Sequence, residues 1–234
     1  MGRLEVIPVE GVPEVRPGDV LADLLVAASV TFEDGDVVVV TQKVVSKAEG
    51  RMVAVDHDDR DARAAVVAAE SVRVLRRRGD LVITETRGGF VCANAGVDLS
   101  NVPDGYATLL PVDADRSARR IRDGLRARTG REVAVIVSDT FGRAWRRGLT
   151  DVAIGCAGIA AIVDLRGTTD ANGRQLHVTE VAVVDELAAA AELVMGKASG
   201  ICAAVVRGVD PSWFRERGSV RDEIVRAPAD DLFR

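Results

Sequence analysis

The stretch Asp36-Val37-Val38-Val39-Val40-Thr41-Gln42 (residues 36–42) places four consecutive valines between polar ends. β-Branched residues favour strands, and an unbroken apolar run is typical of a strand buried on both faces. Other apolar runs of the same character predict further strands at Leu4–Val9, Val133–Ser138 and Cys202–Val206. We therefore predict a sheet that is covered on both sides.

Segments with helical spacing separate these runs. A short helix carrying Leu21, Leu24 and Leu25 is expected to be capped by Asp19. Three longer helices are predicted, over Arg60–Arg78, Ser117–Arg128 and Asp185–Met195, the last of them stopped by Gly196. Further strands are predicted at Leu81–Thr86, Phe90–Ala93 and His177–Val184, whereas Val152–Val163 fits a strand or a helix equally well. The fold class is α/β or α+β, and the strand order is not readable from the pattern.

The composition narrows the range of functions. With 234 residues the chain can bury a core without disulfides or a structural metal. Its 31 basic and 36 acidic residues give a net charge of −5, which argues against a nucleic-acid partner. Arginines between residues 116 and 128 are interpreted as a solvated helix face, with attraction of a phosphorylated substrate as the alternative. The separated Cys92, Cys156 and Cys202 fit buried thiols, and no apolar stretch approaches the ~20 residues that span a bilayer. We expect a cytoplasmic protein without a membrane partner.

Several familiar catalytic motifs are absent from the sequence. It contains no G-x-x-x-x-G-K-[ST] phosphate loop and no G-x-S-x-G nucleophile elbow. Gly155 and Gly158 lack the spacing of a dinucleotide-binding loop, and two histidines, His57 and His177, give little support to a zinc hydrolase. Any phosphate chemistry must therefore use other segments.

Two polar segments follow predicted strands and contain candidate ligand-binding residues. In the first, Lys43 and Lys47 are suited to phosphate oxygens, although an ordinary solvated turn is the favoured interpretation from composition alone. The second, Asn94–Asn101, is rich in oxygen donors that suit a hard cation, although Asx turns are the favoured interpretation from composition alone.

A third polar segment, Ser138–Gly148, is the most informative. Asp139 and Thr140 supply hard oxygens, and Arg143, Arg146 and Arg147 supply three cations close by. A divalent metal beside guanidinium groups is what phosphoryl transfer requires, whereas pairing of the arginines with nearby acids is the structural alternative. In a fourth segment, Asp185 is expected to cap the Ala-rich helix. Together the segments predict a metal and polyphosphate site, but their spacing does not name the reaction.

Four stretches in this order resemble signatures of the coenzyme F420-0:L-glutamate ligase family: VVSKAEGR (44–51), NAGVDLSNV (94–102), VSDTFGRAWRRG (137–148) and VTEVAVVDELAAAAELVMGK (178–197). The resemblance extends over nearly the whole chain. It implies a GTP-dependent, GDP-forming ligase that uses Mg²⁺ or Mn²⁺, two ions per site, and K⁺. It also implies that a substrate carboxylate is phosphorylated to an acyl phosphate before L-glutamate is joined to coenzyme F420-0, or its dehydro form, by γ-linked amide bonds.

The resemblance also assigns roles to residues. Asp98 and Asp139 resemble ligands of a first metal and Thr140 a ligand of a second, with Asp98, Asp139 and Arg146 as the catalytic set. The nucleotide contacts that it implies are Gly11, Val12, Pro13, Glu14, Gln42, Lys43, Lys47 and Asn101, and the loop Met195, Gly196, Lys197, Ala198, Ser199 and Gly200. Two departures stand out. Lys197 replaces an acidic metal ligand of archaeal members, and Gln42-Lys43 replaces Ser-Thr.

The fold that the resemblance implies is α+β, with a mixed sheet in a two-part arrangement and an intertwined homodimer. Residues 1–234 are expected to form one functional unit without the nitroreductase-like domain that is fused in some relatives. Two alternatives to the ligase are a nucleotide- or deazaflavin-binding module without turnover and a metal-dependent phosphohydrolase using the same aspartates.

Overall fold

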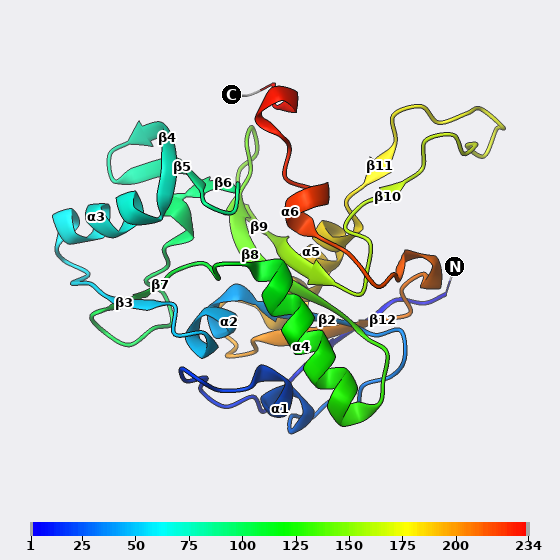
Figure 1. Cartoon of the computed structure of the whole chain (residues 1–234), viewed down its shortest axis with the longest axis horizontal. Coiled ribbons are helices and arrows are strands. Elements are labelled where there is room, and N and C mark those ends of the chain that lie inside the picture. Colours follow the sequence, from blue (N-terminus) through cyan, green and yellow to red (C-terminus); the bar gives the residue numbers. More distant parts are fainter. Residues whose placement is uncertain (1, 233–234) are drawn as a thin grey trace.

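The computed structural model describes residues 2–232, so Met1, Phe233 and Arg234 of the predicted 1–234 unit lie outside the described residues. Its centre is a five-stranded sheet in the order β1-β12-β2-β8-β9 (Figure 1). The strands are β1 (Glu5–Pro8), β12 (Ala203–Arg207), β2 (Val37–Thr41), β8 (Ala134–Gly142) and β9 (Leu149–Ala157). Only β2 and β8 are parallel, and the other neighbours pair antiparallel. The sheet is therefore mixed, as predicted.

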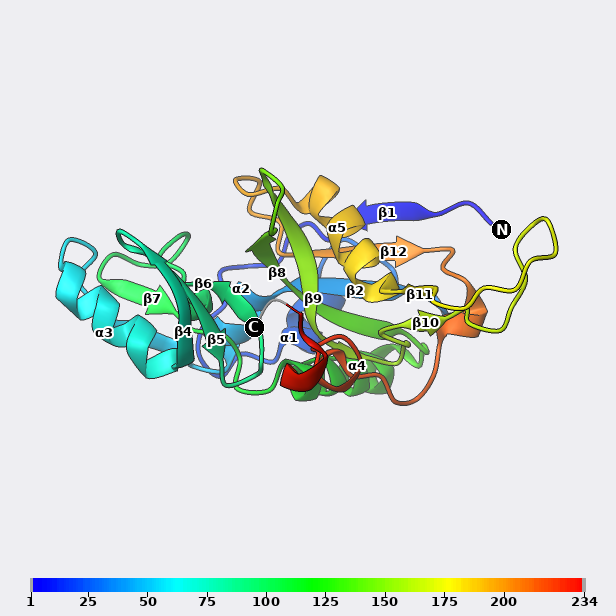
Figure 2. The same ribbon diagram turned by 90° about the horizontal axis from the view of Figure 1, so that it is seen from above.

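The four valines of β2 explain why this strand lies at the centre. Val38 and Val40 pack in one core cluster with α1 (Leu21–Val26) and α4 (Ala114–Thr129). Val37 and Val39 face the opposite side, against α5 (Val183–Met195). All four side chains are fully buried, as the continuous apolar run predicts. Helices α1 and α4 cover one face of the sheet and α5 covers the other (Figure 2).

A second, smaller part projects from one end of the central sheet (Figures 1 and 2). It contains a three-stranded sheet, β4-β5-β6, a two-stranded sheet, β3-β7, and the helix α3. Their bounds are β3 (Met52–Ala54), α3 (Arg60–Glu70), β4 (Ser71–Arg78), β5 (Leu81–Thr86), β6 (Val91–Ala93) and β7 (Tyr106–Thr108). The two-part α+β arrangement agrees with the expectation. The strands predicted at Leu81–Thr86 and Phe90–Ala93 are confirmed as β5 and β6, which pair antiparallel on either side of Gly88-Gly89.

The predicted helix over Arg60–Arg78 is wrong in its second half. The helix ends at Glu70, and residues 71–78 form β4, which pairs with β5. Val72 and Leu75 have helical spacing, but Val72 and Val74 also alternate with arginine, as in a strand. Pairing with β5 supplies backbone hydrogen bonds to residues 71–78 and decides the outcome.

Other boundaries also differ from the predictions. The strand expected at His177–Val184 shrinks to β11 (Glu180–Val181), paired with β10 (Val163–Asp164), because α5 already begins at Val183. The undecided range 152–163 begins in β9. Neither predicted cap is correct: the Asp19 carboxylate accepts from the Arg16 backbone nitrogen, and Asp185 accepts from that of Ala153. The remaining elements are α2 (Gln42–Ala48), α6 (Val220–Glu223) and the 3-10 turns η1 (Asn94–Gly96), η2 (Pro211–Trp213) and η3 (Pro228–Asp230).

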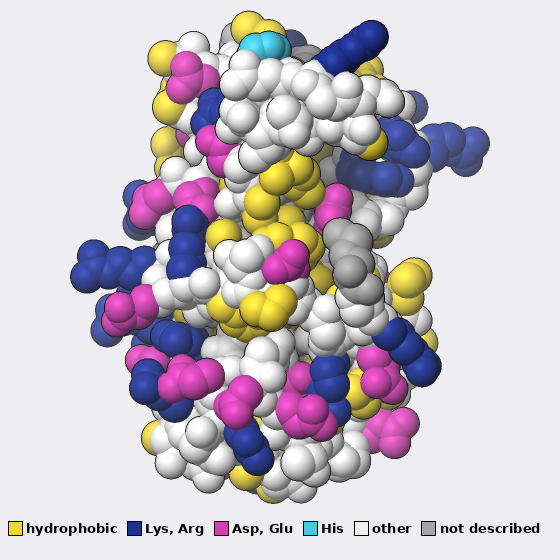
Figure 3. All heavy atoms as spheres, turned by 90° about the vertical axis from the view of Figure 1, so that its right-hand side faces the viewer, with side chains coloured by type: hydrophobic (Ala, Val, Ile, Leu, Met, Phe, Trp, Pro, Cys, Tyr) yellow, Lys and Arg dark blue, Asp and Glu magenta, His cyan; other side chains and the backbone are white. Residues whose placement is uncertain are grey.

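The burial of the cysteines and the distribution of surface charge can be compared with what the composition predicts. Cys92 and Cys156 are buried and Cys202 is half-buried. Arginines of α4 pair with Asp23, Glu49 and Glu132, which supports the interpretation of a solvated helix face. On the face shown in Figure 3, acidic and basic side chains are interspersed around a band of hydrophobic side chains. No helix among residues 2–232 is both long and apolar enough to cross a bilayer.

Candidate active site

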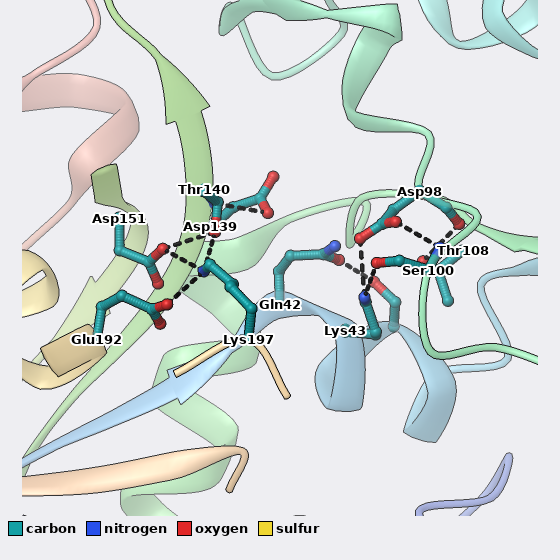
Figure 4. Close-up of polar contacts among 11 residues, drawn as sticks. Gln42, Lys43, Asp98, Ser100, Thr108, Asp139, Thr140, Asp151, Glu192 and Lys197 are labelled. Carbon is teal, nitrogen blue, oxygen red and sulfur yellow. Dashed lines mark hydrogen bonds and ion pairs between the residues drawn. The ribbon is translucent and has the colours of Figure 1, made fainter. Parts of the chain in front are cut away.

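Asp139 and Thr140 lie on a strand, although the predicted strand ended at Ser138. β8 continues to Gly142 and, beyond a register shift between Val137 and Ser138, pairs with β9 as a hairpin. Successive side chains of a strand point to opposite faces. Thr140 therefore points toward Asp151 on β9, whereas Asp139 points the other way (Figure 4).

Asp139 has the most perturbed carboxyl group of this region. Burial raises its pKa to about 7, opposed by a hydrogen bond from the Thr140 backbone nitrogen and assisted by the negative charges of Asp98 and Asp151. Asp139 also lies close enough to Cys92, on β6, to help burial raise the pKa of that thiol to about 12. The side chain thus sits at the junction of the two parts, where a cation would be attracted.

Asp98 approaches the same junction from the smaller part. Its backbone exchanges two hydrogen bonds with Thr108 of β7, at 3.0 and 2.9 Å. Lys43 Nζ lies 2.9 Å from Asp98 Oδ2 and donates to Ser100 Oγ at 2.7 Å. Burial acts to raise the pKa of Asp98, but hydrogen bonds from Lys43 and Ser100 outweigh it and lower the pKa. Asp98 is therefore ionised at neutral pH.

The structure brings the two predicted metal ligands together. Asp98 and Asp139 lie on either side of the start of α2, which carries Lys43 (Figure 4). They are close enough for the charge of Asp98 to help raise the pKa of Asp139. Within residues 2–232 no group of three or more His, Cys, Asp or Glu side chains forms a complete metal site. Mg²⁺ commonly binds through one or two carboxylates, with water and phosphate oxygens completing its coordination. The pair Asp98 and Asp139 fits such an ion.

Several of the predicted nucleotide contacts lie on α2 or contact it. Lys47 is buried, and its Nζ lies 2.6 Å from Glu14 Oε1, so Glu14 is held against α2. Gln42 is also buried, and its Oε1 accepts a hydrogen bond from Ser46 at 2.9 Å. Asn101 is exposed, three residues after Asp98.

The remaining predicted residues divide between the core and the surface. Met195 is fully buried against the sheet, whereas Gly196 to Gly200 form an exposed loop. Arg146 is exposed at the tip of the β8–β9 hairpin. Within the described chain, Arg143, Arg146 and Arg147 form no ion pair with a carboxylate, so the pairing alternative finds no support.

Two acidic residues that sequence reasoning missed complete the region. Asp151 is buried and accepts hydrogen bonds from Ser138 at 3.0 Å and from Thr140 at 2.6 Å. Lys197 Nζ lies 3.0 Å from Asp151 Oδ1 and 2.7 Å from Glu192 Oε1. The sequence signal for Asp151 is a single aspartate at the start of an apolar run. It could be assigned to the site only once the register of β9 against β8 was known.

Comparisons with known proteins identify the relatives of this chain. Residues 11–208 match the family described as F420-0:Gamma-glutamyl ligase. A protein of Methanopyrus kandleri named coenzyme F420:L-glutamate ligase is 45% identical, with 100% of both chains covered. Proteins of that name from Methanothermobacter thermautotrophicus and Archaeoglobus fulgidus are 43% and 42% identical, with 99% of this chain and 99% and 97% of theirs covered.

The fold and these similarities define the class of the protein as a mixed-sheet α+β chain whose relatives are named as L-glutamate ligases. The chain belongs to the F420-0:gamma-glutamyl ligase family.

Proposed function

We propose that this chain joins L-glutamate to coenzyme F420-0, or its dehydro form, through γ-linked amide bonds, with GTP converted to GDP and phosphate. The observation that carries the proposal is the end-to-end similarity to proteins named coenzyme F420:L-glutamate ligase, at up to 45% identity. The proximity of Asp98 and Asp139 at the junction of the two parts supports the proposal.

The proposed chemistry has two steps. An oxygen of the substrate carboxylate attacks the γ-phosphorus of GTP, and GDP leaves with the electrons of the broken bond. The glutamate amine then attacks the acyl carbon of the acyl phosphate, inorganic phosphate leaves, and the amine loses a proton. Activation is necessary because an ionised carboxylate is a poor acceptor for an amine until one oxygen becomes a good leaving group.

The side chains of the junction are suited to these steps. Asp98 and Asp139 would hold Mg²⁺ or Mn²⁺, which supplies charge neutralisation for the phosphates, and K⁺ is the proposed monovalent ion. Lys43 and Lys47 present ammonium groups on one short helix, each already paired with a carboxylate from another segment. These pairs hold the lysines in place for phosphate oxygens, which accept from ammonium groups in charge-assisted hydrogen bonds.

The test follows the atoms of the carboxylate. Purified protein is incubated with GTP, Mn²⁺, K⁺, L-glutamate and unglutamylated coenzyme whose terminal carboxylate carries ¹⁸O. We expect stepwise glutamyl addition by mass spectrometry and ¹⁸O in the released phosphate, because the attacked oxygen leaves with phosphorus.

The controls separate the alternatives. Omission of glutamate should stop net phosphate release, and ATP should support little product. Phosphate release that is independent of glutamate would indicate a phosphohydrolase, and tight binding without turnover would indicate a binding module. Product without ¹⁸O in phosphate would contradict the acyl phosphate.

Arg146 provides a prediction about the hairpin tip. Arg146→Ala is expected to lower kcat/KM for glutamyl addition by roughly 10- to 100-fold, because a guanidinium without a carboxylate partner is available to the phosphates. Arg119→Ala, on the exposed face of α4, is the matched control and should leave the kinetics unchanged. Wild-type kinetics for Arg146→Ala would remove this residue from the site.

We also propose that the chain functions as a homodimer, with the smaller part at the interface. Helix α3 contains six consecutive apolar residues, Ala64–Ala69, yet none of its residues is buried. Beside it, Val72 and Val74 of β4 are 64% and 50% exposed. Val67, Val74 and Val82 line a groove between α3 and the small sheet. Apolar surface of this kind favours a protein partner, and a second copy presents a matching surface.

The proposed homodimer can be tested by measuring the mass of the protein in solution. Light scattering after gel filtration should give twice the 24.8 kDa chain mass for the wild type. Val74→Asp places a charge in the groove and should give the single-chain mass, whereas Leu4→Asp, at an exposed position on the other part, should not. A dimer that survives Val74→Asp would move the interface elsewhere.

A further inference from the structure

The ammonium of Lys197 lies among oxygen atoms from three different elements. It is ion-paired to Asp151 on β9 and to Glu192 on α5, at 3.0 and 2.7 Å. It also donates a hydrogen bond to Thr140 Oγ1 on β8 (Figure 4). Two carboxylates and a hydroxyl around one point are the ligands that a hard cation prefers. Here a cation from the chain itself occupies that point.

The backbone directs Lys197 into this position. α5 ends at Met195, which is buried, and Gly196 adopts φ 61° and ψ 172°, a combination open essentially to glycine alone. The turn sends the following side chain back toward Glu192, on the last turn of the same helix, and across to Asp151. Lys197 is thus seated by the fold and is not a free surface lysine.

A second divalent ion, which the family resemblance implies at Thr140, does not fit these residues. The Thr140 hydroxyl already donates to Asp151 and accepts from Lys197. An ion bound there would meet the ammonium at hydrogen-bonding distance, and like charges so close repel strongly in a partly buried site. Lys197 contacts all three oxygen-bearing side chains of this point. The first site differs, because Lys43 is ion-paired to Asp98 and, among the described residues, Asp139 forms no ion pair. The resemblance implies an acidic ligand at position 197, and this chain has a residue of opposite charge there.

We propose that Lys197 is a built-in cation that replaces the second divalent ion, so that each chain binds one such ion, at Asp98 and Asp139. This inference deepens the proposed function and rests on it for the first ion. The fixed ammonium then offsets one of the two negative charges of Asp151 and Glu192 and keeps Thr140 oriented on the face of β8 opposite Asp139.

The experiment counts Mn²⁺ ions per chain, without nucleotide or turnover, by electron paramagnetic resonance of the free ion during a titration. The wild type should bind one ion and Lys197→Ala two, because removal of the ammonium leaves two carboxylates and a hydroxyl around a vacated point. Lys197→Arg keeps the positive charge and should bind one. Far-UV circular dichroism checks that each variant is folded, as expected for a residue whose side chain is 58% exposed.

A variant of the first site separates the two proposals. Asp139→Asn should bind no ion and Asp139→Asn/Lys197→Ala one. If the wild type binds none but Lys197→Ala gains one, the first site fails and the role of Lys197 stands. If Lys197→Ala gains no ion, or the wild type already binds two, the inference is overturned.

Discussion

Asp139→Asn is expected to lower the turnover of glutamyl addition by about 10³-fold or more, while the fold remains intact. The amide keeps the size of the carboxyl group but removes the charge that would hold a divalent ion against the phosphates. Steady-state rates with saturating GTP, glutamate and Mn²⁺ give the measurement. Asp58→Asn, at an exposed position in the smaller part, is the control and should retain wild-type rates. Turnover of Asp139→Asn within a few fold of the wild type would remove Asp139 from the site.

The same substitution should stabilise the metal-free protein at alkaline pH. Burial and neighbouring carboxylates raise the pKa of Asp139 from 3.8 to about 7 in the folded chain. Between these two values the folded state holds a proton that the unfolded state has released, so folding is progressively disfavoured as pH rises from about 4 to 7. Below this window both states are protonated, and above it both are ionised and the full cost remains.

The expected pH effect can be measured by thermal unfolding in EDTA at pH 5 and pH 8. Asp139→Asn should gain on the order of a few kcal/mol over the wild type at pH 8 and much less at pH 5. Addition of Mn²⁺ should stabilise the wild type and not the variant. An equal difference between the proteins at both pH values would contradict the assignment of this pKa.

The central sheet was predictable because burial on both faces leaves a simple pattern. β2 and β12 read as continuous apolar runs, and each was placed within a residue or two. β4 was not predictable in the same way, because Val72 and Val74 are exposed in the single chain and the spacing to Leu75 also suits a helix. Pairing with β5 determines that residues 71–78 form a strand. Such pairing cannot be read from a short stretch of sequence.

The residues of the site also fall into those that the sequence indicated and those that only the three-dimensional structure shows. Asp98 and Asp139 were named from oxygen-rich segments after apolar runs together with the family resemblance. The structure places both at one junction, and their role as metal ligands stays a prediction. Asp151 and Glu192 were not accessible, since their relation to Thr140 depends on the register of β9 and on the packing of α5. Lys197 was identified as a departure from the family pattern, but its three oxygen partners became visible only in three dimensions.

Gly155→Ala is expected to cause the largest loss of stability of any single methyl added to the chain's central sheet. A β-carbon at Gly155 would lie 2.2 Å from the carbonyl carbon and 2.4 Å from the carbonyl oxygen of Ala114, at the start of α4. Backbone atoms cannot rotate away, so the strand or the helix must move. We expect a loss of about 3 kcal/mol or more in the free energy of unfolding, measured by urea denaturation.

The matched control lies on the neighbouring strand. A β-carbon at Gly142 of β8 meets nothing closer than Leu149 Cδ2 at 4.0 Å, so Gly142→Ala should change stability by less than about 1 kcal/mol. The damage at Gly155 should also reach the site, because the Asp115 carboxylate accepts from the Cys156 nitrogen at 2.8 Å and β9 carries Asp151. If α4 is displaced, β9 shifts against β8, and Thr140 and Lys197 lose the carboxylate that joins them. Equal stability of the two glycine variants would mean that the approach of α4 to β9 is not the constraint that fixes this strand.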